Sequence, residues 1–147
     1  MSTSLTALLA IHLAATAAMG GLIWFVQLVH YPLFDAVGDD GFAGYARDHQ
    51  RRTSWVVGPL MAVEGLSAIA LLFVPTDDLP RALPVAGLAL LLVIHASTLW
   101  LQVPRHRELA AGHSAVATRR LVASNWIRTI GWSARTVLAV VMLLVAA

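Results

Sequence analysis

The stretch VASNWIRTIGWSARTVLAVVMLLVA (122–146) decides the fold class, because it is long and apolar enough to cross a lipid bilayer as one helix. It nevertheless contains Arg128 and Arg135. A charged side chain near the centre of a bilayer costs at least roughly 2.5–3.5 kcal/mol on insertion scales. We therefore expect both arginines to point into a helical bundle and away from lipid.

The composition of the whole chain is that of an integral membrane protein. Of the 147 residues, 59% are hydrophobic and only 12% are charged, and the mean hydropathy is +0.75. A soluble domain of this size could not keep so much apolar surface away from water. Because no polar stretch is long enough to form a separate soluble domain, we expect a single transmembrane domain over residues 1–147.

Four apolar segments reach the length of about 20 residues that a transmembrane helix needs. They cover residues 5–30, 54–74, 84–103 and 122–146. Open sheet edges are not viable in lipid, so these segments are expected to be helices. The sequence therefore predicts an all-α fold, an integral membrane four-helix bundle with up-down-up-down connections.

The loop between the first two apolar segments also has a helical pattern. In DDGFAGYARDHQRR (39–52), the residues Phe42, Tyr45, His49 and Arg52 follow one another at helical spacing. This pattern predicts a short interfacial helix that lies on the membrane surface between spans 1 and 2.

The arginines of the loops predict the orientation. The loops 31–53 and 104–121 lie on one side of the membrane and hold seven arginines, whereas the opposite side holds only Arg81. By the positive-inside rule, we expect a multi-pass protein of the bacterial inner membrane with both termini outside the cytoplasm. The same rule accounts for the pI of about 9.9, so no nucleic-acid partner is expected. Cysteine is absent, which excludes disulfides and thiolate metal sites.

Polar residues recur on one face of each apolar segment. In the last segment Asn125, Arg128, Trp132 and Arg135 are spaced 3, 4 and 3 apart, which places them on one face of a helix. The other segments contribute His12, Thr16, Gln27 and His30 in the first, Glu64 in the second, and His95, Gln102 and His106 in the third. These residues predict an internal polar core that opens toward the cytoplasm.

Histidines and one carboxylate make this core a candidate metal or haem site. Glu64 is the only acid deep in any span, and it is also the expected counter-charge for one of the two arginines. Histidine and carboxylate ligands suit iron, zinc and copper, and bundle cores host such sites. The predicted metal ligands are His30, His49, Glu64, His95 and His106. They would come from different helices and a loop, and a purely structural ion pair with packing histidines stays open as the alternative.

The same core contains residues suited to catalysis and to cofactor binding. The catalytic candidates are Glu64, His95, Asn125, Arg128 and Arg135, of which the last three would stabilise an anionic oxygen or a cofactor carboxylate. The cofactor-binding candidates are His30, His95, Gln102 and Trp132. Trp132 would wall an aromatic or quinone-like pocket, or would only pack in the bundle. The expected cofactor is an iron or copper ion, or haem.

Five strings resemble a group of small bacterial four-helix membrane proteins. They are QLVHYPLFDAVG (27–38), YARDHQRR (45–52), VVGPLMAVE (56–64), HASTLWLQVPRHREL (95–109) and NWIRTIGWSAR (125–135). This resemblance covers nearly the whole chain and implies the fold, but no activity. The architecture is more distantly similar to the anthrone-oxygenase-like membrane proteins, through its size, its four spans and its polar last helix. That second resemblance implies oxygenase chemistry, without a motif that matches residue by residue.

Three functions fit these patterns. The leading hypothesis is a membrane-embedded metal- or haem-binding redox protein or oxygenase, which would act on a lipophilic aromatic or quinone-like substrate that enters from the bilayer. The second is a small proton or solute transporter that uses the polar core as its pathway. The third is a structural or accessory subunit of a larger membrane complex. A second copy of the chain is a further candidate partner, although a stable homo-oligomer that holds a cofactor would count against the third role.

Overall fold

The computed structural model describes residues 3–75, 77 and 79–147, and these residues are helical almost throughout, with no strand. The elements are α1 (Thr3–Phe25), η1 (Val26–His30), η2 (Pro32–Ala36), α2 (Asp39–Leu71), α3 (Ala82–Ser97), η3 (Thr98–Gln102), α4 (Val103–Ala111) and α5 (Ala115–Ala146). Of the three short segments, η1 and η3 are π-helical and η2 is a 3-10 helix. Because η1 continues α1 and η3 joins α3 to α4, the chain forms four long helical rods.

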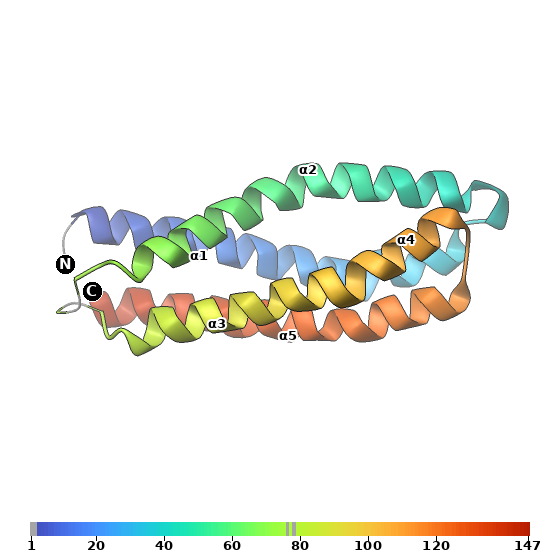
Figure 1. The fold of residues 1–147 in the computed structure, drawn as a ribbon. Coiled ribbons are helices and arrows are strands. Elements are labelled where there is room, and N and C mark those ends of the chain that lie inside the picture. The colour runs from blue at the N-terminus through green and yellow to red at the C-terminus, as the bar shows by residue number, and fades with distance from the viewer. Residues whose placement is uncertain (1–2, 76, 78) are drawn as a thin grey trace.

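The four rods lie side by side in an elongated bundle. Successive rods run in opposite directions, and the two chain termini meet at one end (Figure 1). Helix α1 packs against α2 and α5, α3 packs against α5, and α2 packs against α4. Each rod is long and apolar enough to cross a membrane. The structure therefore confirms the prediction of an all-α fold with four long apolar helices.

The prediction of a separate short helix over residues 39–52 is wrong. These residues form the first half of α2, which runs without interruption from Asp39 to Leu71. No glycine or proline separates Tyr45 from Val57, so nothing breaks the backbone hydrogen bonding at the expected junction. A helix of 33 residues is about 50 Å long. The hydrocarbon core of a bilayer is only about 30 Å thick. The helix is therefore longer than such a core, and its charged first half is additional to the apolar second half.

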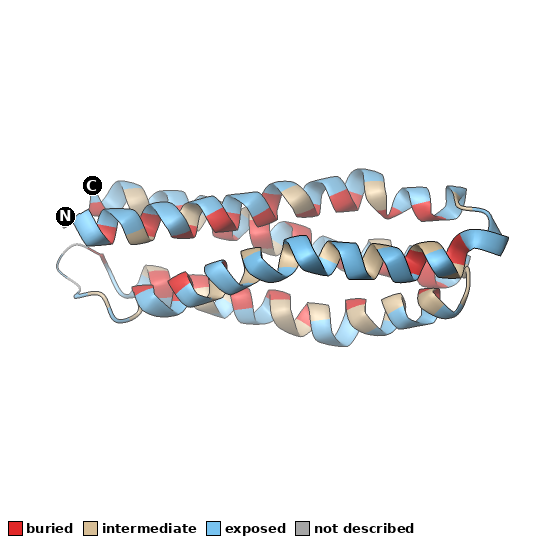
Figure 2. Ribbon diagram, turned by 90° about the horizontal axis from the view of Figure 1, so that it is seen from above, coloured by how far each residue is buried: buried red, intermediate tan, exposed pale blue. Residues whose placement is uncertain are grey.

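Burial follows the helix faces. Buried residues line the inside of the bundle and exposed residues cover its outside (Figure 2). Many of the exposed residues are large and apolar, for example Leu66, Phe73 and Trp100.

Two glycines allow close helix packing inside the bundle. A Cβ atom added at Gly131 would lie 2.7 Å from Cγ1 of Ile94, and one added at Gly20 would lie 2.9 Å from Oγ1 of Thr136. At both positions the neighbouring helix occupies the space that a side chain would need.

Candidate functional site

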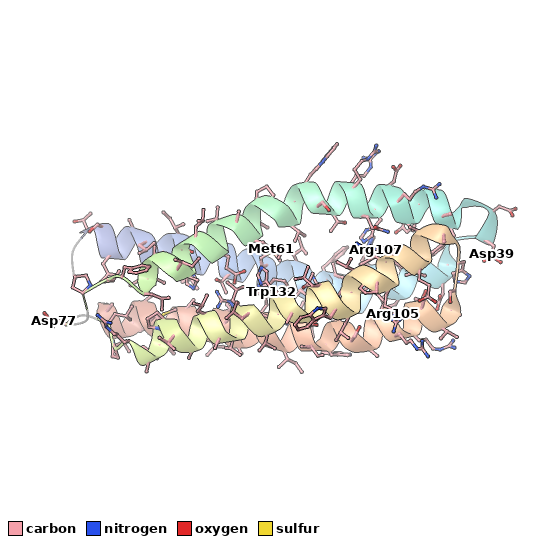
Figure 3. All side chains as sticks on the ribbon, in the orientation of Figure 1. Asp39, Met61, Asp77, Arg105, Arg107 and Trp132 are labelled. Carbon is pink, nitrogen blue, oxygen red and sulfur yellow. The ribbon has the colours of Figure 1, made fainter. Side chains whose placement is uncertain are left out.

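The polar core consists of two groups of side chains at different levels of the bundle. The first, which we call the ion-pair centre, comprises Thr16, Glu64, Trp132 and Arg135. The second, which we call the histidine centre, comprises His30, Tyr31, His49 and His106. Trp132 lies near the middle of the bundle, whereas Arg107, on the same helix as His106, lies toward the end that carries Asp39 (Figure 3).

The ion-pair centre is enclosed. Arg135 Nε donates to Glu64 Oε1 at 2.8 Å, and Thr16 Oγ1 donates to the same oxygen at 3.1 Å. Trp132 Nε1 donates to Glu64 Oε2 at 3.0 Å, and Nη1 of Arg135 donates to the carbonyl oxygen of Gly87. Glu64 is 0% exposed and Arg135 is 1% exposed. Both carboxylate oxygens are therefore occupied by donors of this chain, an arrangement that fixes the register of three helices.

His95 lies apart from both centres. Its Nδ1 atom is hydrogen-bonded to the carbonyl oxygen of Leu91, one turn earlier on α3, at 2.8 Å. Within the described part of the chain, no hydrogen bond or ring contact joins His95 to Glu64 or to another histidine. The structure therefore does not bring this predicted ligand together with the other candidates.

Arg128 connects the two levels, because it contacts Trp132 of the ion-pair centre and lies beside the Tyr31 hydroxyl of the histidine centre. Asn125 Nδ2 donates to Gln27 Oε1 at 2.8 Å, and Arg128 Nη1 donates to Asn125 Oδ1 at 3.2 Å. The Cζ atom of Arg128 lies 5.3 Å from the centre of the Trp132 ring. This is the geometry of a cation–π contact. Gln102, on the neighbouring rod, donates to Ser124 Oγ at 2.8 Å.

The histidine centre is a cluster of aromatic rings in hydrogen-bond contact. His30 Nε2 lies 2.7 Å from His49 Nδ1, and Tyr31 OH lies 2.9 Å from His106 Nε2. The rings of His49 and His106 are 5.6 Å apart between centroids. Thr53 Oγ1 is also within 3.1 Å of His49 Nδ1. The cluster thus joins residues of the first, second and third rods.

The hydrogen bonds restrict the proton positions in this cluster. A contact between two imidazole nitrogens requires one of them to carry the proton and the other to accept it. His49 Nδ1 satisfies both of its contacts as an acceptor from His30 Nε2 and from the Thr53 hydroxyl. In this arrangement, which is assigned from the network, the proton of a neutral His49 is on Nε2.

Both π-helical segments end at this level. His30 is the last residue of η1 and Gln102 is the last residue of η3. A π-helical turn contains one residue more than an α-helical turn, and such turns occur frequently at functional sites. Compared with a regular α-helix of the same sequence, each extra residue turns the side chains that follow it to a different side. Tyr31 and His106 are among these side chains.

Two chambers adjoin the histidine centre. The apolar chamber, an open groove of 540 Å³, lies between the first and second rods. Its lining consists of four apolar residues, Leu22, Phe25, Val26 and Val56, and of His30, Tyr45, Asp48, His49, Arg52 and Thr53. The polar chamber, of 340 Å³, is lined by residues that include Tyr31, His49, Gln102, His106, Arg107 and Arg128. His49 and Thr53 line both chambers and therefore form part of the wall between them.

The five predicted metal ligands are not gathered at one point. In residues 3–75, 77 and 79–147, no group of three or more His, Cys, Asp or Glu is arranged to hold a metal ion. His30, His49 and His106 do approach one another, but Glu64 belongs to the ion-pair centre. Tyr31 was not predicted as a site residue, because its hydrogen bond to His106 joins two rods that sequence spacing does not relate.

Comparisons of the chain with protein-family models, with curated proteins and with solved structures give no match. The function is therefore argued from the geometry of the two chambers and of the side chains between them.

Proposed function

We propose that the four rods cross the bacterial inner membrane with both termini outside the cytoplasm. The support is the distribution of charge along the bundle. Seven arginines lie in the first half of α2, in α4 and in the first turns of α5, toward the end of the bundle opposite the termini: Arg47, Arg51, Arg52, Arg105, Arg107, Arg119 and Arg120. Only Arg81 lies in the connection at the other end. Arginine-rich connections remain on the cytoplasmic side.

We propose further that the protein is a membrane-embedded redox protein that acts on a lipophilic aromatic or quinone-like molecule in the apolar chamber. A single observation carries this proposal, namely that the hydrogen-bonded pair of His30 and His49 lines a chamber whose exposed wall area is mainly apolar. Ligand sites typically have volumes of roughly 300–1,000 Å³ and combine apolar walls with a few placed polar groups. The 540 Å³ chamber has both properties.

The histidine pair suits proton exchange with an oxygen of such a molecule. An imidazole accepts a proton from a phenol or quinol when the two groups are within hydrogen-bond reach. A proton taken up by His30 has a second imidazole at 2.7 Å, and His49 in turn lies beside His106. The electrons need a separate acceptor, for which we propose iron, copper or haem. His49 and His106 would be its ligands, so that the contact between His30 and His49 is kept.

A metal assay and a visible absorption spectrum test the cofactor. The protein would be produced with iron, copper and haem supplied and purified in mild detergent. Near-stoichiometric metal or a haem absorption band, lost in His49→Ala and His106→Ala, would support the proposal. His95→Ala is the matched control, because it also removes an imidazole but His95 lies outside the histidine centre.

Binding of a short-chain benzoquinone, measured by equilibrium dialysis, tests the substrate class. Loss of one uncharged hydrogen bond should weaken binding by about threefold to tenfold in His49→Ala, and binding to His95→Ala should equal that of the wild type. A protein that contains no metal or haem and binds no quinone would contradict the redox proposal. It would favour the transport function, which proteoliposome flux tests, or the accessory function, which co-purifying partners test.

A further inference from the structure

The polar chamber on the other side of His49 has a different chemistry from the apolar chamber. Its lining includes two arginines, Arg107 and Arg128, and two histidines, but no Asp or Glu. Gln102, which is 1% exposed, also lines it and has a buried Oε1 atom without a hydrogen-bond partner. A chamber lined in this way has a positive potential and unused hydrogen-bonding capacity.

Arg128 is the decisive residue, because it is buried without a counter-charge. It is 7% exposed, and its Nε atom has no hydrogen-bond partner. Among the described residues, no carboxylate lies within ion-pair distance of its guanidinium group. Arg135, two turns further along the same helix, has its counter-charge in Glu64 at 2.8 Å. The partners of Arg128 are all uncharged, namely Asn125, the Trp132 ring and the Tyr31 hydroxyl. A buried charge without a counter-charge is costly, so a bound anion would supply the negative charge that Arg128 lacks.

The shape and the remaining lining indicate the kind of anion. Val57, Met61 and Val103 give the chamber an apolar part, and the volume of 340 Å³ is small for a ligand site. A guanidinium group matches the planar geometry of a carboxylate. A compact organic acid satisfies both parts of the chamber, with its carboxylate at Arg128 and its apolar body against these three side chains.

We infer that the polar chamber binds a small monocarboxylate with an apolar body, such as an aromatic acid, through Arg128. This site is separate from the one proposed for the lipophilic substrate, since the two chambers share only His49 and Thr53. The two proposals can therefore fail independently.

Equilibrium dialysis with labelled benzoate and, in parallel, labelled inorganic phosphate tests the inference on the full chain in detergent. We expect saturable benzoate binding to the wild type that is at least about tenfold weaker in Arg128→Gln, because a charge-assisted contact is lost. Arg107→Gln should bind benzoate about threefold more weakly, because this exposed arginine lines the chamber but keeps water around it. Arg105→Gln is the matched control and should bind like the wild type, because Arg105 is paired with Glu108 and lies outside this lining.

Each alternative result overturns the inference. Absence of saturable benzoate binding to the wild type at millimolar concentrations would exclude the site, and phosphate binding without benzoate binding would show the wrong class of anion. Unchanged binding in both Arg128→Gln and Arg107→Gln would show that benzoate binds elsewhere. If Arg128→Gln failed to fold, Arg107→Gln compared with Arg105→Gln would decide. Benzoquinone binding should be retained in Arg128→Gln, which separates this result from a failure of the proposed function.

Discussion

Arg135 and Glu64 form an ion pair in the interior of the bundle, with Arg135 Nε 2.8 Å from Glu64 Oε1 and both side chains at most 1% exposed. Arg128 lies on the same helix face but makes no such pair. The two arginines in the middle of the last helix therefore have different surroundings. One is neutralised by the chain itself, whereas the other borders a chamber without acidic side chains.

Glu64→Gln should destabilise the protein strongly. The substitution keeps the size of the side chain but leaves the charge of Arg135 buried and uncompensated. Breaking a buried pair in this way costs about 3–5 kcal/mol. The measurement is the free energy of unfolding in detergent, with helix content followed as denaturant is added.

Thr16→Val is the matched control for this change. It removes one hydrogen bond to the same carboxylate oxygen and leaves the ion pair intact, so the expected loss is only about 1–3 kcal/mol. If Glu64→Gln lost no more stability than Thr16→Val, the pair would not be a main structural contact.

Gly131→Ala should also destabilise the bundle. The added Cβ atom would lie 2.7 Å from Cγ1 of Ile94, so α3 and α5 would have to separate slightly. Overpacking of this kind costs about 1–3 kcal/mol. Gly21→Ala is the control, because nothing lies within 4 Å of its added Cβ atom. It should leave the apparent Tm unchanged or raise it, since alanine favours the helix by about 1 kcal/mol. Equal losses in both variants would contradict this account.

Single cysteines test the proposed orientation, because the chain has no cysteine of its own. Asp77 and Asp40 are both exposed. Asp77 lies at the opposite end of the bundle from Asp39, the neighbour of Asp40 at the start of α2 (Figure 3). On intact cells, a thiol reagent that does not cross the inner membrane should label Asp77→Cys and should label Asp40→Cys only after lysis. The reverse pattern would place the termini in the cytoplasm.

The sequence predicted the helix faces well, because helical periodicity determines which residues share a face. Asn125, Arg128, Trp132 and Arg135 are all buried on the inner side of α5, as expected from their spacing. The expectation that Glu64 neutralises one arginine is confirmed for Arg135. These features depend only on the order of residues within one helix and on the need to pair a buried charge.

The contacts between rods could not be predicted in the same way. The axial shift and the rotation of each rod relative to its neighbours determine which residues of different rods are in contact. They determine whether Glu64 pairs with Arg135 or with Arg128, and which histidines contact each other. The π-helical segments add to this difficulty, since the residues of η1 and η3 carry no proline or glycine that would mark an irregular turn. A prediction from regular α-helical spacing therefore misplaces the side chains that follow them.

Deletion of Leu28 should leave the histidine centre in place. Leu28 lies in η1 and is 60% exposed, so its side chain contributes little to the bundle interior. Without this extra residue, η1 would become an α-helical turn. Because a π-helical turn and an α-helical turn each complete one revolution, His30 should keep its direction and its contact with His49. We expect benzoquinone to bind as it does to the wild type, with unchanged helix content measured by circular dichroism.

Leu28→Ala separates the effect of the extra residue from that of its side chain. This variant keeps the length of η1 and removes only exposed apolar atoms, so the contact at 2.7 Å between His30 and His49 should persist and benzoquinone should bind as in the wild type. The deletion variant should bind benzoquinone as well as Leu28→Ala does. If it folded but bound benzoquinone at least about threefold more weakly than Leu28→Ala, as expected for loss of a hydrogen bond, then the extra residue would itself be needed to position His30.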